Sequence, residues 1–188
     1  MLYATFWQRL GALLLDSVCY VPILLLSMLI SSNGRHLYLA CAGLGVLINV
    51  WFYIYLVRRF GGTPGKLMMG LQIVKVDGSP LSYREAVLRN IVELSLTVFV
   101  STALSIGAMR MTDAEYLSLG WQQRFAEQLS LSPGWYVWAD ALFRIWNLSL
   151  LIVMLANKKR RTSHDFLAGT AVVKRVRDKP FISTDVTA

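Results

Sequence analysis

The chain has 188 residues, of which 55% are hydrophobic and 16% are charged, and it carries a formal net charge of +8. This composition is far more apolar than that of an ordinary soluble domain and indicates one membrane domain over residues 1–178. The positive charge does not indicate a nucleic acid partner, because the basic residues bracket apolar runs instead of forming a face with stacking aromatics.

Four apolar runs have the roughly 20-residue length that crosses a bilayer as a helix. The sequence therefore predicts an all-α transmembrane fold, a four-helix membrane bundle with spans at about residues 10–30, 37–57, 86–107 and 135–156. The first run is too long for the core of a signal peptide, and no small-residue cleavage motif follows it, so we expect it to stay as an anchor. Cys19 and Cys41 lie inside spans, where we expect small packing residues and no disulfide.

Residues 58–85, between the second and third spans, are expected to lie outside the membrane and to contain a short strand around Leu71, Ile73 and Val74. A second run with strand character, residues 170–173, could pair with it. The predicted bundle thus carries a small β-strand element on one side of the membrane.

An amphipathic helix is predicted at about residues 113–129, between the third and fourth spans. Thr112 and Glu115 form a capping box at its start, and an apolar stripe follows along one face. We expect this helix to lie on the membrane interface. Residues 179–188 are expected to be a disordered tail.

The Lys and Arg residues predict the orientation of the chain. Fourteen of the 19 lie in the N-terminus, the middle segment or the tail, and three lie on the opposite side, namely Arg35, Arg110 and Arg124. By the positive-inside rule, both termini and residues 58–85 are cytoplasmic, and the helix at 113–129 is extracytoplasmic. The basic run of the tail could contact anionic lipid head groups through Lys158, Lys159, Arg160 and Arg161.

Each predicted span carries a polar side chain about 10–16 Å from its basic boundary, at roughly 1.5 Å per residue. These residues are Asp16, Asn49, Glu93 and Asn147. A carboxylate at the centre of a spanning helix costs about 2.5–3.5 kcal/mol, so it requires a partner, a path for water or a function. The sequence predicts that the four residues form one polar layer.

Two interpretations of this layer stay open. In one, Asp16 and Glu93 form an ion or proton site, and nearby charges modulate it; the charge partners are Arg9, Arg89, Arg144 and Asp140. In the other, the layer is a buried ion-pair network that fixes the packing of the helices. No set of nucleophile, base and orienting group is visible, so we expect no enzymatic activity, no cofactor and no metal site.

Four pieces in order resemble the RDD family of membrane proteins, which is named for one arginine and two aspartates. They are Arg9 with Asp16, the glycine-rich residues 61–74, the pair Arg89 and Asn90, and the run that begins at residue 160. The resemblance places the family residues on Arg9, Asp16 and Asp165. It implies a protein of the bacterial inner membrane, and it gives no support to Asp140 and Arg144, because the fourth span departs from shorter members.

The resemblance also implies two competing functions. Members are suspected of transport, with sodium/proton exchange proposed for some, and a eukaryotic relative looks like an assembly factor in a membrane complex. We therefore expect either a cation or proton-coupled transporter, acting as a homo-oligomer, or a non-catalytic scaffold that holds another membrane protein.

Overall fold

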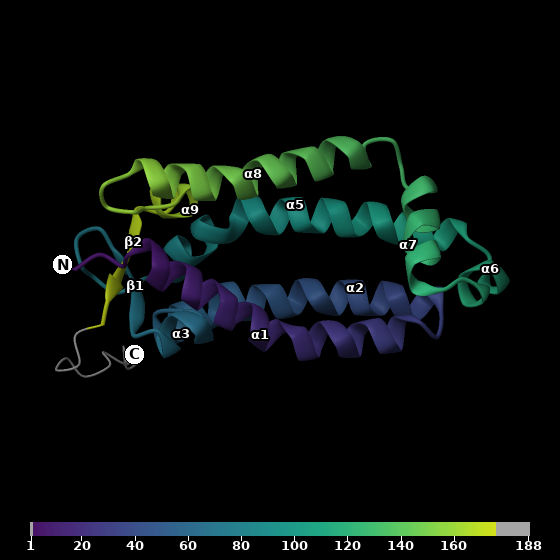
Figure 1. Cartoon of the computed structure of the whole chain (residues 1–188), viewed down its shortest axis with the longest axis horizontal. Coiled ribbons are helices and arrows are strands. Elements are labelled where there is room, and N and C mark those ends of the chain that lie inside the picture. Colours follow the sequence, from purple (N-terminus) through teal and green to yellow (C-terminus); the bar gives the residue numbers. More distant parts are fainter. Residues whose placement is uncertain (1, 176–188) are drawn as a thin grey trace, which may run out of the picture.

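The computed structural model describes residues 2–175, in which four long helical segments run side by side (Figure 1). They are α1 (Phe6–Ser31), α2 (Arg35–Val50), α5 (Tyr83–Arg110) and α8 (Tyr136–Ala156), and α2 continues through a π-helical turn, η1 (Trp51–Tyr55), into α3 (Leu56–Phe60). Each segment is long and apolar enough to cross a membrane, which confirms the predicted four-span fold. The tail predicted at residues 179–188 lies outside the described residues.

The outward faces of these helices are covered with aliphatic side chains. Leu24 is 65% exposed and Leu29 is 67% exposed, although both belong to the most apolar helix of the chain. Such surfaces are unfavourable in water and suit contact with the hydrocarbon of a bilayer.

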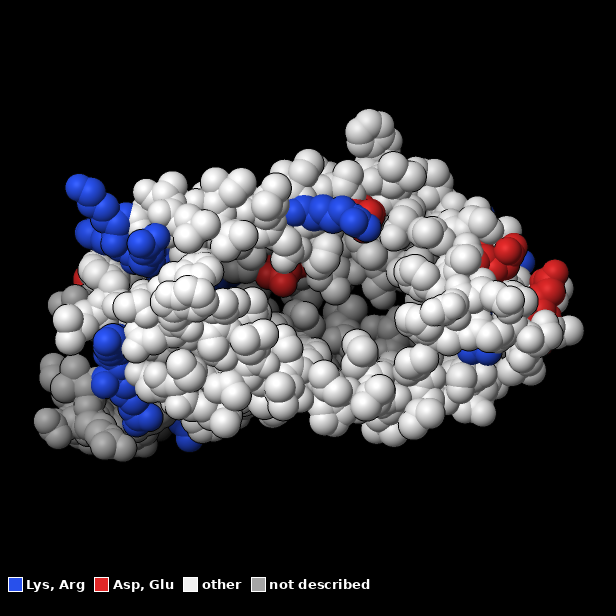
Figure 2. All heavy atoms as spheres, viewed as in Figure 1, with Lys and Arg blue, Asp and Glu red and all other residues white. Residues whose placement is uncertain are grey.

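The helices pack in the order α1, α2, α5 and α8. Within the described residues, α1 and α8 do not pack along each other, so the arrangement is an open row and not a closed ring. Figure 2 shows that the molecule is hollowed between the α1–α2 pair and the α5–α8 pair.

A small sheet lies at the end of the helices that holds the N-terminus (Figure 1). Its strands, β1 (Leu71–Lys75) and β2 (Thr170–Lys174), are antiparallel, with Ile73 opposite Val172. The predicted pairing of these two distant segments is therefore confirmed. Tyr3 forms a further bridge to Val173, so the N-terminal residues cover the outer edge of β2.

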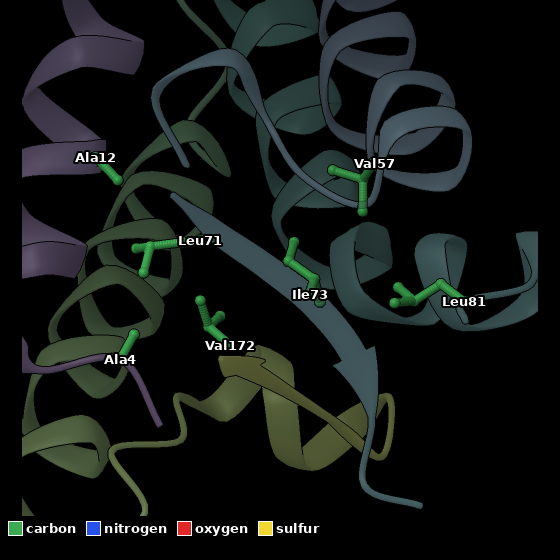
Figure 3. Close-up of a cluster of buried hydrophobic side chains, with 7 residues drawn as sticks. All are labelled: Ala4, Ala12, Val57, Leu71, Ile73, Leu81 and Val172. Carbon is green, nitrogen blue, oxygen red and sulfur yellow. The ribbon is translucent and has the colours of Figure 1, made fainter. Parts of the chain in front are cut away.

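The core of this end is apolar and joins segments from across the chain. Figure 3 shows side chains from the N-terminus, α1, α3, β1, β2 and the loop before α5 pointing toward one another, namely Ala4, Ala12, Val57, Leu71, Ile73, Leu81 and Val172. Two short helices lie beside this core, α4 (Pro64–Met68), which packs against α1 and β1, and α9 (Ser163–Leu167), which packs against β2. We call this part the basic end, because Lys and Arg side chains gather around it (Figure 2).

The opposite part, the far end, consists of α6 (Asp113–Ser118) and α7 (Trp121–Ser130). The structure divides the helix predicted at 113–129 into these two, because Leu119 and Gly120 have extended backbone. Glycine lowers helix stability by about 1 kcal/mol relative to alanine, which makes Gly120 a natural break. α7 crosses the end of α5 so closely that a Cβ at Gly107 would lie 3.0 Å from the carbonyl carbon of Gln128.

Candidate functional site

Asp165 joins two helices through two arginines. Arg9 of α1 donates from Nη1 to Asp165 Oδ2 at 3.0 Å, and Arg89 of α5 pairs with Oδ1 of the same carboxylate. The Asp165 side chain is fully buried, and both arginines are at most 9% exposed. The carboxylate of one short helix therefore connects α1, α5 and α9.

The local sequence places this carboxylate. Thr162 is the N-cap of α9 and Asp165 is its N3 residue, so the pair forms a capping box, in which the Thr162 backbone N–H donates to Oδ2 at 3.0 Å. The Thr170 hydroxyl donates to Oδ1 at 3.1 Å. Burial alone would raise the pKa of Asp165, but the charges of Arg89 and Arg9, with the hydrogen bonds from Thr162 and Arg89, hold that pKa well below its usual value.

Asp16 is bound by the segment that follows α3. Its carboxylate accepts hydrogen bonds from the Thr63 hydroxyl at 2.6 Å and from the Gly65 backbone N–H at 2.8 Å, and Lys66 Nζ lies 3.6 Å away. Lys66 Nζ also donates to the Thr63 hydroxyl at 3.1 Å. Asp16 is 2% exposed, so these contacts replace water around the charge.

A glycine is needed for this contact. α4 approaches α1 so closely that a Cβ at Gly65 would lie 2.7 Å from the backbone nitrogen of Asp16. Pro64 occupies the first helical turn of α4, where its missing N–H is not required. In the Pro-Gly-Lys sequence, Pro64 therefore begins the helix, Gly65 allows α4 to approach α1 closely, and Lys66 supplies the ammonium group beside Asp16.

Glu93 has a different kind of partner. Its Oε2 lies 3.1 Å from Nε2 of His164, and Trp146 of α8 donates from Nε1 to the same nitrogen at 3.1 Å. The Glu93 side chain is 29% exposed, and no arginine or lysine of the described residues forms an ion pair with it. Glu93 is thus an intramembrane carboxylate whose partner is an imidazole.

Two tyrosines lie within electrostatic range of both Asp16 and Glu93. They are Tyr20 of α1 and Tyr53 of η1, whose rings stack with centroids 6.2 Å apart. The Tyr20 hydroxyl is buried without a hydrogen-bond partner among the described residues. Asn90 donates to the Tyr53 carbonyl at 2.9 Å, which satisfies a backbone group at the π-helical turn.

The structure does not assemble the polar layer as one site. Asn147 is exposed and donates to the carbonyl of Phe143 in its own helix, and Asn49 lies half-buried in α2. Arg144 pairs with Asp140 at 2.7 Å on the exposed face of α8, where its side chain is 75% exposed. Equal depth along four helix axes does not require that the side chains point toward one centre.

The charge partners also differ from those expected. Within the described residues no arginine forms an ion pair with Asp16; Lys66 lies beside it, while Arg9 and Arg89 bind Asp165. The contact of Lys66 with Asp16 of α1 was not predicted, although Pro64 and Gly65 before it indicated a tight turn.

Two other predicted features can be located. Among the described residues, no three His, Cys, Asp or Glu side chains come close enough to form a metal site. Of the basic run proposed to contact lipid, Lys158 and Lys159 are exposed, whereas Arg161 donates to the carbonyls of Thr170 and Asp165. Arg160 donates to the carbonyl of Leu155.

The apolar helices, the buried ion pairs at the basic end and the sheet together define a polytopic membrane protein. The model of the RDD family matches residues 3–169, and the chain belongs to that family. Arg9, Asp16 and Asp165, all within the matched region, are the residues on which the resemblance placed the family motif.

The chain is also similar to the uncharacterized protein YckC of Bacillus subtilis (strain 168), with 38% identity over 92 residues. The matched region covers 47% of this chain and 58% of that relative. The chain therefore spans only a little more than half the length of the curated relative that it matches.

Proposed function

We propose that this membrane protein is a cation or proton-coupled transporter of the sodium/proton exchange type, and that Glu93 with His164 carries the proton. The observation that supports it is the 3.1 Å contact between Glu93 Oε2 and His164 Nε2 inside the helix row. A carboxylate fixed by arginines stays ionised over the physiological range, whereas a carboxylate beside an imidazole can exchange a proton with it.

The hydrogen bonds around His164 support one shared proton. Nε2 cannot accept from Trp146 and donate to Glu93 at the same time, because it has either a lone pair or a proton. With the proton on Nε2, the imidazole donates to Glu93 and the Trp146 N–H loses its acceptor. With the proton on Glu93, the carboxyl group donates toward a nitrogen that Trp146 also approaches. The state without either proton would bring two lone pairs together.

Asp16 is the candidate cation site. Its ammonium partner, Lys66, is at 3.6 Å the most distant of its three contacts, and a metal cation could take its place between the carboxylate and the Thr63 hydroxyl. Tyr20, whose buried hydroxyl has no partner among the described residues, lies within electrostatic range of both carboxylates. Asp16 and Glu93 would then hold a cation and a proton in alternation.

The proposal includes a location and an orientation. Membership of the RDD family supports a bacterial inner membrane as the location. The positive-inside rule supports an orientation with both termini in the cytoplasm, since the N-terminus, the middle segment and the tail carry most of the Lys and Arg. Four helices enclose little space by themselves, so we propose a homo-oligomer. Lys158 and Lys159, both exposed, would contact anionic lipid head groups.

The experiment is cation-driven pH change in proteoliposomes of purified protein, with gradients of sodium, potassium and lithium. Glu93→Gln should abolish the pH change, because the amide keeps the size of the side chain and cannot take up a proton. Glu127→Gln, a change on the exposed face of α7, is the matched control and should leave the flux unaltered. Thermal unfolding in detergent establishes that each variant is folded.

The second candidate is a scaffold that holds another membrane protein. It is favoured by Asp165, because both oxygens of this carboxylate are paired with arginines, Arg9 and Arg89. Such buried ion pairs hold helices together and leave no oxygen free for a transported ion. A scaffold would show no flux with any cation from folded protein, would tolerate Glu93→Gln, and would copurify with a stoichiometric partner. That set of results would contradict the transport proposal.

A further inference from the structure

A cavity of about 390 Å3 lies at the far end, between the end of α1 and the pair α6 and α7. Its volume falls within the roughly 300–1,000 Å3 typical of small-molecule sites. Most of its wall is apolar, and Leu25, Leu29, Trp121 and Phe125, which contribute to it, are between 44% and 67% exposed. The cavity is therefore continuous with the lipid-facing surface of α1.

Two donors at the cavity lack acceptors. Gln128 is 3% exposed, yet its Nε2 has no hydrogen-bond partner in the described part of the chain. Nε of Arg124, one helical turn earlier on α7, is also buried without a partner. Buried donors are nearly always satisfied in folded proteins, and both residues line the cavity, so an oxygen acceptor bound there would pair with donors that the protein leaves unpaired once these side chains turn toward it.

The cavity is also positively charged. The Arg124 guanidinium stacks on the ring of Tyr116 with its carbon 4.4 Å from the centroid, and its Nη2 donates to the carbonyl of Leu119 at 2.9 Å. Neither contact neutralises its charge, and no carboxylate of residues 2–175 forms an ion pair with it. A ligand that satisfies this site carries negative charge on oxygen at one end.

We propose that this cavity binds an anionic membrane lipid, with phosphate oxygens on Arg124 and Gln128 and an acyl chain along Leu25 and Leu29. The apolar wall favours a lipid over a soluble phosphate, because a small anion would leave that wall in contact with water. Trp121 at the rim suits the boundary between head groups and hydrocarbon. Leu25 and Leu29 follow Asp16 on α1 by nine and 13 residues, roughly 14–20 Å along the helix, so the site is separate from Asp16 and does not depend on the transport proposal.

The test is lipid retention measured by native mass spectrometry, after purification from nanodiscs of equal parts phosphatidylglycerol and phosphatidylcholine. We expect the wild type to retain phosphatidylglycerol, and Arg124→Gln and Gln128→Met to lower its occupancy about tenfold, the scale of one charge-assisted hydrogen bond. Gln123→Met, an exposed position of α7, is the matched control and should retain lipid as the wild type does.

Two further arms make the result decisive. Arg124→Lys keeps the charge and should retain more phosphatidylglycerol than Arg124→Gln, which separates binding from a general weakening of α7. Inorganic phosphate alone should neither bind nor raise the melting temperature. Equal retention of both lipids, unchanged retention in Arg124→Gln, or saturable binding of inorganic phosphate would each overturn the proposal.

Discussion

Asp165→Asn is expected to destabilise the protein strongly, because the change leaves two arginines without their shared carboxylate. Asp165 is fully buried, accepts from Arg9 Nη1 at 3.0 Å and pairs with Arg89 on its other oxygen. Asparagine has the same shape but no charge, and its amide group would point donor hydrogens at a guanidinium that is itself a donor. The buried positive charges would then have neither water nor an anion near them.

The size of the effect follows from the burial. Removing one partner of a buried ion pair typically costs about 3–5 kcal/mol, since the remaining charge is uncompensated. For a chain of this length, 1 kcal/mol corresponds to about 2–4 °C in melting temperature, so we expect a decrease of roughly 6–20 °C. The matched control is Asp113→Asn, which removes an ion pair to Arg35 from a side chain that is 64% exposed and should cost at most about 1 kcal/mol.

The assay is thermal unfolding of the purified protein in one detergent at pH 7, followed by circular dichroism. Arg89→Gln is combined with Asp165→Asn, and the double variant should be more stable than the sum of the two single effects, because the second change removes a charge that the first left unpaired. Two results would refute the conclusion that Asp165 is the shared partner of Arg9 and Arg89. One is strict additivity of the two single effects on stability, and the other is a melting temperature of Asp165→Asn no lower than that of the Asp113→Asn control.

Two further predictions concern the same end of the molecule. Gly65→Ala should lower the free energy of unfolding by about 1–3 kcal/mol through overpacking, because its Cβ would lie 2.7 Å from the Asp16 backbone nitrogen. Gly134→Ala is the control and should not lower it, because the space around Gly134 is open. Thermal unfolding compares the two variants. Because the pKa of Asp165 is lowered in the folded protein, the unfolded chain binds its proton first as the pH falls. Its stabilisation is therefore complete above about pH 4 and is lost progressively below that, and melting temperatures from pH 7 to pH 3 should decrease more steeply in the wild type than in Asp165→Asn.

The spans and the sheet could be predicted because each follows from a local pattern of residues. The four helices follow from apolar runs of membrane length, and the pairing of Ile73 with Val172 follows from two short runs rich in β-branched residues. The break at Gly120 was missed, since the capping box and the apolar stripe on either side of it fit one continuous helix.

The partners of the motif residues could not be predicted, because they depend on contacts between distant parts of the chain. Arg9 and Asp165 are separated by 156 positions, and no local pattern couples them. The depth of Asp16 along its helix was derived from the helical rise, but depth does not give the direction in which a side chain points. The partner of Asp16 is partly a backbone N–H, that of Gly65, which has no side-chain signal at all.

The structure gives the three buried or half-buried carboxylates Asp165, Asp16 and Glu93 different capacities to exchange partners. Asp165 is held by two guanidinium groups that stay charged at any physiological pH, so a change of protonation does not break its bonds. Asp16 and Glu93 are held by an ammonium and an imidazole, groups that can be displaced or can lose a proton. Suppose that α1 and α5 stay joined at Asp165 while Asp16 and Glu93 exchange partners. The helices must then move farther along their length, at the open side of the row, where α1 and α8 do not pack against each other. A cross-link between α1 and α8 at mid-span would then stop cation flux, whereas a scaffold would tolerate it.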